Sequence, residues 1–505
     1  MHLQRIRVPD FRVLKDVDIT FEKDFVPRIF PLGSLNGGGK STLLQLIFTL
    51  LHCSTDPERK PFLQNLIHGF KLRDDSPKRT LAIIDIWDNN QVVNLEFFSC
   101  KDSYIQELLS NDVSESIDNY SFNFSAPGKL EELNYKTSIW EEINKLGKFL
   151  RESNSTDQQN SIIQQVKLLI EQIKQKQLFF KDFIDIDEKN NIILKTKNQN
   201  EQLIEVLELA DLKKSANTYN QIITFYYNLI KSMESVAEVV MEYINSKNWI
   251  FISSYKISEK EENDQNVLLC HIKGLNMSEI LEKKSFLKNL SQKTFIAAPS
   301  TQVFLFIDQE KRNLLFKSKA IEDEDYYSQL KTAKSRLRNL FTYDFLAVDI
   351  LIQAFKDAFE QDVTEVVETG KYGNNYHNLK NELNQMLFNK KINIDQDLSG
   401  VNFTLDRNGE TIELSPEDLS HGELKRLSIY MWLKHHNIED AIVLMDEIEI
   451  AFHPDWQYQI ISDLQEWVPN NQYILATHSY ELCQALTPAH VKELEPKLIK
   501  QDPEN

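Results

Sequence analysis

The fold of this chain can be predicted from the stretch Gly33-Ser-Leu-Asn-Gly-Gly-Gly-Lys-Ser-Thr42. It follows an apolar segment at residues 25–32 and precedes another at 43–48, which predicts a strand, a glycine-rich loop and a helix in that order. Glycines allow backbone N–H groups to approach phosphate oxygens closely, and a helix N-terminus favours negative charge. The stretch therefore predicts a phosphate-binding loop within an α/β sheet.

Lys40 and Ser41 have the most specific chemistry in this loop. In such loops the lysine reaches the β- and γ-phosphates of a nucleotide, and the serine hydroxyl holds Mg²⁺. Ser34 stands where the first glycine of the usual motif is expected, with Gly33 before it. The alternative is a glycine-rich turn without a ligand. The candidate nucleotide-binding residues are Ser34, Asn36, Gly37, Gly38, Gly39, Lys40, Ser41 and Thr42.

The length and composition are typical of a soluble protein of several domains. The chain has 505 residues, with 41% hydrophobic and 26% charged residues, and a domain usually takes on the order of 150 residues. It has no apolar run of about 18 residues, so we expect no membrane span. The N-terminus lacks the apolar stretch of a signal peptide. The four cysteines lie far apart, which disfavours a zinc site or disulfide framework and favours the cytoplasm.

The net charge of −19, from 57 basic and 76 acidic residues, argues against a dedicated nucleic-acid binder. Such proteins usually present a basic face. A basic run at residues 331–338 exists, but a helix with solvated lysines explains it equally well. We therefore expect nucleic acid to be contacted only through a complex, in which a partner or further copies of the chain provide positive charge.

The composition changes along the chain and predicts five segments. Residues 105–290 are rich in glutamine, asparagine, lysine and glutamate, and apolar residues at 162–173 and 222–240 fall on helical stripes. The segments are 1–104 (strands with the glycine-rich loop), 105–290 (helical insertion), 291–324 (return strand), 325–392 (helical subdomain) and 393–505 (strand and loop, then alternating helix and strand).

Hydrophobic periodicity predicts individual elements in these segments. Alternating or continuous apolar patterns predict strands at 3–8, 17–21, 81–87, 92–97, 294–299, 441–446 and 473–476. Amphipathic patterns predict helices at 346–359, 376–388 and 420–435. The strands at 81–87 and 92–97 are expected to form a hairpin.

The second chemical motif is Ala441-Ile-Val-Leu-Met-Asp-Glu447, an apolar run followed by two acids. A buried parallel strand that ends in a carboxylate beside the loop can hold Mg²⁺, which is the role expected of Asp446. Glu447 can then orient and deprotonate an attacking water. The alternative is a strand that ends in two solvated acids.

The third motif is Leu419-Ser-His-Gly-Glu423 at the start of a helix. Ser420 and Glu423 have the spacing of a capping box, which explains the motif without a ligand. The same groups can bind phosphate, because Ser420 and the N–H of Gly422 would face a γ-phosphate at the helix N-terminus. The two interpretations are compatible.

The fourth motif is Tyr473-Ile-Leu-Ala-Thr-His-Ser479, in which an apolar strand ends next to a histidine. His478 can contact a γ-phosphate there, although a single histidine after a strand is more often structural. The order of the four motifs favours the functional interpretation. In a parallel sheet the carboxyl ends of the strands meet at one edge, where ligands bind.

With these motifs assembled, the chain resembles the ABC-type ATPase heads of the SMC, RecF and RecN group. The loop corresponds to Walker A, 419–423 to the signature, 441–447 to Walker B and His478 to the switch histidine. The resemblance implies an α/β fold, a P-loop NTPase of ABC/SMC-head type with a mixed sheet and a largely helical insertion. It also implies ATP and Mg²⁺ as cofactors.

The resemblance assigns further residues. Asp10-Phe-Arg-Val-Leu14 is similar to the start of these heads, which implies that Arg12 lies near the nucleotide. Gln302 resembles the Q-loop glutamine, a nucleotide and metal contact. His421 and Ile448 replace a glycine and a proline of the usual motifs without removing a required group. The expected catalytic residues are Glu447 and His478, the expected metal ligands are Ser41, Asp446 and Gln302, and the expected phosphate contacts in the signature are Ser420, Gly422 and Glu423.

The resemblance also implies an assembly and a biological setting. In such heads two copies enclose ATP between the loop of one copy and Ser420 of the other, so we expect a head-to-head dimer or a larger oligomer. Asp446-Glu-Ile-Glu-Ile-Ala-Phe-His-Pro454 looks like the motif of overcoming-lysogenization nucleases and anti-phage defence ATPases. The ATPase of the Septu type, which is paired with an HNH nuclease, is the closest functional relative we name.

We therefore expect a sensor or regulator of a separate effector, since residues 479–505 are too few to hold a nuclease domain. Three alternatives remain. The first is a DNA-repair ATPase that contacts DNA directly, which the acidic charge and the lack of a long coiled coil disfavour. The second is a scaffold that binds ATP without hydrolysing it. The third is an anticodon nuclease, which would need a further domain.

Overall fold

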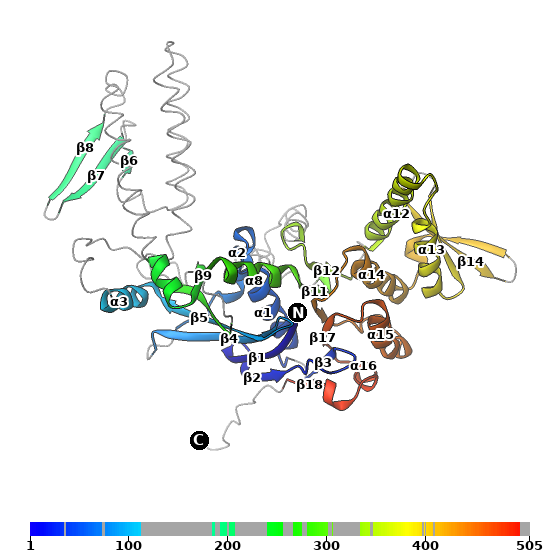
Figure 1. The fold of residues 1–505 in the computed structure, drawn as a ribbon, viewed down its shortest axis with the longest axis horizontal. Helices are drawn as coiled ribbons and strands as arrows, with labels where there is room; N and C mark the ends of the chain where they lie inside the picture. Colours follow the sequence, from blue (N-terminus) through cyan, green and yellow to red (C-terminus); the bar gives the residue numbers. More distant parts are fainter. Residues whose placement is uncertain are drawn as a thin grey trace, which may run out of the picture. The chain divides into compact units, whose positions relative to one another are not determined.

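The structure is a computed structural model that contains two compact units. One unit comprises Met1–Cys100, Asn248–Ser258 and Leu268–Asn505, and the other comprises Lys101–Lys247 and Glu259–Val267. Figure 1 shows the elements in sequence colours. The described residues are 1–34, 37–72, 76–112, 184–186, 192–198, 201–207, 240–255, 266–274, 280–300, 306, 334–343, 347–395, 398, 400–407 and 410–494.

A six-stranded parallel sheet forms the core of the first unit. Its strands, in spatial order, are β12 (Leu340–Thr342), β11 (Thr294–Ala298), β16 (Ile442–Asp446), β17 (Gln472–Ala476), β3 (Ile29–Gly33) and β18 (Lys492–Glu493). All neighbouring strands pair in parallel. Every residue of β16 and β17 is buried, because continuous apolar strands of this kind are covered on both faces.

The register of this sheet sets the position of the motifs. Asp446 lies opposite Ala476, and Ala476 lies opposite Leu32. The carboxyl ends of β16, β17 and β3 are therefore level, as expected from the order of the motifs. The helices that pack on or follow these strands are α1 (Lys40–His52), α14 (His421–His435), α15 (Pro454–Trp467) and α16 (Tyr480–Gln484).

A second six-stranded sheet combines strands from residues 2–101 with two strands from the middle of the chain. Its order is β2 (Leu14–Thr20), β1 (His2–Phe11), β4 (Lys78–Trp87), β5 (Val92–Lys101), β10 (Asn266–Lys273) and β9 (Trp249–Tyr255). The pairs β1–β2, β1–β4 and β4–β5 are antiparallel. Together the two sheets give the mixed α/β architecture that the sequence predicted.

The remaining elements are divided between the two units. Those of the first unit are α2 (Lys60–Ile67), α8 (Ile280–Gln292), α12 (Ala347–Thr369), α13 (Asn375–Met386), a three-stranded sheet of β13 (Lys390–Ile394), β14 (Val401–Arg407) and β15 (Glu410–Leu414), and the 3₁₀ turns η1 (Pro57–Arg59), η4 (Pro416–Asp418) and η5 (Pro488–His490). The second unit has α3 (Asp102–Asp112) and a sheet of β6 (Ile184–Ile186), β7 (Ile192–Asn198) and β8 (Glu201–Leu207). No helix in the described part of the chain is long and apolar enough to cross a bilayer.

The structure confirms the predicted strands and helices of the head, with differences of a few residues at their ends. It adds strands that the sequence did not predict. Within 105–290 the described residues include β6 to β10, and two of these, β9 and β10, extend the second six-stranded sheet beyond β5. The helical stripe at 162–173 and all but Val240 of the stripe at 222–240 lie outside the described residues. The division into five segments stays a prediction.

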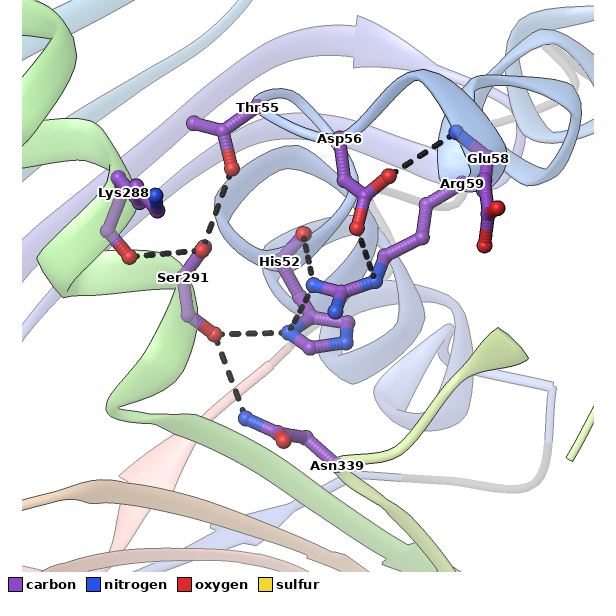
Figure 2. A network of polar contacts seen from close by, with 8 residues as sticks. All are labelled: His52, Thr55, Asp56, Glu58, Arg59, Lys288, Ser291 and Asn339. Atoms are coloured by element: carbon purple, nitrogen blue, oxygen red, sulfur yellow. Dashed lines mark hydrogen bonds and ion pairs between the residues drawn. The ribbon is translucent and has the colours of Figure 1, made fainter. Parts of the chain in front are cut away.

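The C-terminal end of α1 is held by a polar network around the buried His52 and Ser291 (Figure 2). His52 Nδ1 lies 2.7 Å from the carbonyl oxygen of Ser291, which can accept its proton. The Arg59 guanidinium donates to the carbonyl oxygen of His52 at 3.3 Å and pairs with Asp56 at 3.3 Å. The ring of His52 also stacks on Phe48. These contacts tie α1 to α8 and to the turn that follows α1.

Acid should weaken this network. Burial lowers the pKa of His52 to about 4 from 6.5, so the unfolded chain takes up the proton first. The stabilisation is present above pH 6.5 and is lost as the pH falls from 6.5 towards 4. His52→Asn keeps a hydrogen-bond donor but does not titrate. We therefore expect the free energy of unfolding of this variant to fall by about 2 kcal/mol less than that of the wild type between pH 7.5 and pH 5.

Denaturant unfolding at both pH values measures this difference. His453→Asn is the matched control, because the side chain of His453 is 71% exposed and its loss should leave the acid sensitivity unchanged. Equal losses in the wild type and His52→Asn would contradict the prediction.

Candidate active site

The glycine-rich loop adopts a backbone that requires glycine. Gly39, the N-cap of α1, has φ +91°, and Gly37 has φ +81°. A Cβ atom at Gly39 would lie 2.7 Å from Leu14 Cδ2 and 2.9 Å from Val13 Cγ2. Only glycine therefore lets the loop pass the turn between β1 and β2 in this conformation. α1 then begins at Lys40, with its first N–H groups at the edge of the parallel sheet.

Lys40 joins the first and fourth motifs. Its ammonium donates to the carbonyl oxygen and the Oγ of Ser34, each at 3.1 Å, and lies 3.4 Å from His478 Nδ1. Burial lowers the pKa of Lys40, while Glu449 and Asp446 oppose the shift. The lysine therefore stands between the loop and the end of β17, as the motif order predicts.

Ser41 and Asp446 join the first and second motifs. Ser41 Oγ donates to Asp446 Oδ1 at 3.0 Å, although the residues are 405 positions apart in the sequence. Burial, with the charges of Glu447 and Glu449, raises the pKa of Asp446 to about 7, although the hydrogen bond from Ser41 and the charge of Lys40 act in the opposite direction. A buried carboxylate under this repulsion is stabilised by a cation. Hydroxyl and carboxylate oxygens are the ligands that Mg²⁺ prefers, so this pair fits the ion.

Glu447 follows β16 in a strained conformation. It has φ +51°, which costs a non-glycine residue about 1–2 kcal/mol, and its N–H donates to the carbonyl oxygen of Ala476 at 2.9 Å. Its side chain is only partly buried. Strain of this kind collects at functional sites, and here it turns the chain out of the sheet directly after Asp446.

Glu449 is a site residue to which the sequence interpretation gave no role. Its Oε1 accepts the backbone N–H of His478 at 2.7 Å. Its Oε2 is buried and has no hydrogen-bond partner among the described residues. The residue is 9% exposed. The signal in the sequence was the third acid of Asp446-Glu-Ile-Glu449, two residues beyond the expected general base.

The signature motif caps α14. Ser420 Oγ accepts the N–H of Glu423 at 3.2 Å, and the Glu423 carboxylate accepts the N–H of Ser420 at 3.0 Å. Lys390 donates to both oxygens of Glu423 at 2.7 Å. The predicted capping box is therefore confirmed. The contacts of Glu423 are to its own helix cap and Lys390, whereas Ser420 is exposed at the helix start.

Gly422 lies close to the loop after Walker B. A Cβ atom there would meet the carbonyl oxygen of Ala451 at 2.7 Å and the ring of Trp456 at 3.3 Å. The start of α14 thus packs on the residues that follow Glu447 rather than on the glycine-rich loop of the same chain.

The other predicted residues divide into three cases. Arg12 lies in the turn between β1 and β2, with φ +53°, and donates to the carbonyl oxygen of Leu66 at 2.7 Å. Gly38 and Thr42 lie in the loop and the first turn of α1. Asn36 and Gln302 lie outside the described residues.

Comparisons with known proteins agree with this geometry at the level of the family. The family described as AAA ATPase domain matches residues 1–483. The Retron Vc95 probable ATPase of Vibrio cholerae serotype O1 biovar El Tor is 31% identical over an alignment of 103 residues that covers 18% of this chain and 20% of that protein. The Retron Ec83 probable ATPase of Escherichia coli is 44% identical over 46 residues, 9% of this chain and 8% of that protein.

The matched segments thus span a fifth or less of the length of these curated relatives. Among solved structures, the Smc head domain of Pyrococcus furiosus bound to the C-terminal domain of ScpA has a TM-score of 0.29 at 11% identity, covering 96% of this chain and 91% of that one. A second Smc head, bound to the C-winged helix domain of ScpA, has the same TM-score at 9% identity, covering 96% of this chain and 92% of that one. A TM-score of this size assigns no fold, so the fold rests on the family match and the observed sheets.

Proposed function

Because the chain belongs to the AAA ATPase domain family, we propose that it binds ATP with Mg²⁺ and hydrolyses the γ-phosphate as an ABC-type ATPase. The observation that carries the proposal is the junction of three motifs at one sheet edge. Lys40 lies 3.4 Å from His478, and Ser41 donates to Asp446 at 3.0 Å. A strand end, a helix N-terminus and a second strand end converge there as nucleotide binding requires.

Each residue has a distinct part in this proposal. The N–H groups of Gly37 to Ser41 and the ammonium of Lys40 bind the phosphates, and Ser41 and Asp446 hold Mg²⁺. The ion neutralises charge on the phosphate oxygens. Glu447 accepts a proton of the attacking water, whose oxygen bonds to the γ-phosphorus as the bond to the bridging oxygen breaks. ADP is the leaving group, and the water oxygen becomes part of inorganic phosphate. His478 contacts the γ-phosphate and is held by Glu449 through its backbone.

The proposed site is completed by a second copy of the chain. Ser420 is exposed, and its hydrogen bonds are those of its own helix cap. Its hydroxyl and the N–H groups at the start of α14 therefore suit a γ-phosphate bound in the loop of a partner. We propose a head-to-head dimer, which can form part of a larger oligomer.

We further propose that the dimer is the sensor or regulator of a separate effector nuclease, such as an HNH nuclease, in anti-phage defence. Both relatives named above are retron ATPases, which supports a role in bacterial defence systems. Nucleic acid would be contacted through the complex, since the chain itself carries a net charge of −19. Loss of the γ-phosphate would release the dimer and change the state of the effector.

Light scattering after size-exclusion chromatography tests the dimer. We expect the molar mass of the protein in the presence of Mg²⁺ and a non-hydrolysable ATP analogue to be twice its molar mass in the presence of ADP. Ser420→Arg should remain monomeric while it still binds the analogue, because its own loop is intact. Ser415→Arg is the matched control, since Ser415 is also an exposed cap residue but precedes η4.

Pull-down of the product of the neighbouring gene, with ATP and with ADP, tests the regulatory role. Nucleotide-dependent recovery of an effector is expected. A chain that is monomeric with every nucleotide contradicts the dimer, and a lone dimer that recovers no effector contradicts the regulatory role.

A further inference from the structure

Lys425 connects the signature helix to the loop that carries the general base. It lies on the second turn of α14 and is 4% exposed. Its ammonium donates to the carbonyl oxygen of Glu447 at 3.1 Å and to that of Ile450 at 3.0 Å. One side chain of α14 therefore holds both ends of a short segment directly after Walker B.

The surroundings of Lys425 favour this position. Its ammonium lies 4.0 Å from the centre of the Tyr343 ring and 5.4 Å from that of Phe452. The Tyr343 hydroxyl donates to the carbonyl oxygen of Ala297 at the end of β11. Burying an ammonium group is costly unless hydrogen bonds and aromatic faces replace water. Lys425 has both, so its place in the site is well defined.

The segment that Lys425 holds is strained. Glu447 has φ +51° and Ala451 has φ +71°, and neither is glycine. Such conformations persist only where surrounding contacts impose them. Two contacts from the start of α14 do so here, the hydrogen bonds of Lys425 and the close packing of Gly422 on the carbonyl of Ala451. A shift of α14 would therefore move the backbone of Glu447.

We infer that Lys425 is a positioning residue that couples the two ATP sites of the dimer. The inference rests on the proposed function, in which α14 of one copy contacts the ATP bound in the loop of the other. Glu447 of that first copy acts on the ATP in its own loop. Within one chain, Lys425 connects α14, which contacts the ATP in the partner's loop, to Glu447, which acts on the ATP in its own loop. ATP at one site therefore sets the position of the general base at the other site.

Steady-state ATP hydrolysis tests this inference. Lys425→Met keeps the length and apolar stem but removes the donors. We expect kcat to fall by about tenfold or more with KM changed by less than about threefold, since ATP is still bound by the loop. The Hill coefficient for ATP should fall from above about 1.5 to about 1. Lys425→Arg, which keeps charge and donors, should retain most of the coupling.

The matched control is Lys434→Met, because Lys434 is exposed near the end of the same helix. It should behave as the wild type in kcat and Hill coefficient. Thermal melts of each variant show whether it is folded. If Lys425→Met does not fold, Lys425→Gln takes its place, since it keeps a donor but reaches less far, and the same direction of change is expected.

Folded Lys425 variants with wild-type kcat and Hill coefficient overturn the inference. A raised KM with unchanged kcat also overturns it, because that result places Lys425 in ATP binding alone. A wild-type Hill coefficient of about 1 contradicts coupling between the sites. A wild-type chain that hydrolyses no ATP contradicts the proposed function, and with it the inference, whereas an active wild type with an unaffected variant contradicts only the role of Lys425.

Discussion

Glu447→Gln should lower kcat for ATP hydrolysis by about 10²–10⁴-fold while ATP binding is retained. The substitution removes the proton acceptor but keeps the size and the hydrogen-bonding capacity of the side chain. It leaves the Lys40, Ser41 and Asp446 contacts intact, so the loop can still bind the phosphates. Because ATP would persist between the heads, the variant should also accumulate as an ATP-bound dimer.

Single-turnover hydrolysis and light scattering with ATP measure these two effects. Glu439→Gln is the matched control, since Glu439 is an exposed acid that precedes the same strand β16. It should hydrolyse ATP at the wild-type rate. If the wild type and Glu447→Gln turn over ATP equally slowly, the chain is an ATP-dependent scaffold, and the proposed hydrolysis is wrong.

Lys40→Met should weaken ATP binding by about a hundredfold, which corresponds to about 2.7 kcal/mol. The ammonium of Lys40 is the basic group that stands between the glycine-rich loop and His478. Without this positive charge, the negative charges of the phosphates would be repelled more strongly by Asp446, Glu447 and Glu449, which are the acids whose charges act on Lys40. Hydrolysis should fall with binding, because less ATP is held at the site.

Isothermal titration with the non-hydrolysable analogue measures the affinity, and the shift in melting temperature on adding ATP gives a second readout. Lys15→Met is the matched control. Lys15 is half exposed and pairs with Asp10 close to the loop, so its loss should leave both readouts unchanged. An ATP affinity of Lys40→Met within about threefold of the wild type would contradict the assignment of the loop.

Much of the head could be predicted from the sequence because the signals are local. The run 441–446 is apolar throughout, and a continuous apolar run bounded by acids is typical of a buried parallel strand. The capping box of Ser420 and Glu423 depends on residues three apart, so it is visible in the sequence and is present in the structure. The order of the motifs then predicts a common edge, since parallel strands align their carboxyl ends.

The sequence did not predict β9 and β10, because β10 lies beside β5, which ends at Lys101, and β9 lies beside β10 at the edge of the sheet. In such a sheet, a strand is stabilised by neighbours far away in the sequence, and local composition is a weak guide. The polar composition of residues 105–290 pointed instead to helices.

Local pattern thus accounts for the motifs, most elements of the head and the capped helix, because periodicity and short spacings determine them. The roles of Glu449, Lys425 and Tyr343 emerge from the fold alone. Glu449 reaches His478 across 29 positions, and Lys425 reaches Glu447 across 22. Contacts of this kind depend on how strands and helices pack and on the sign of φ at Glu447. Residues far apart in the sequence determine both, so a short stretch of sequence does not predict them.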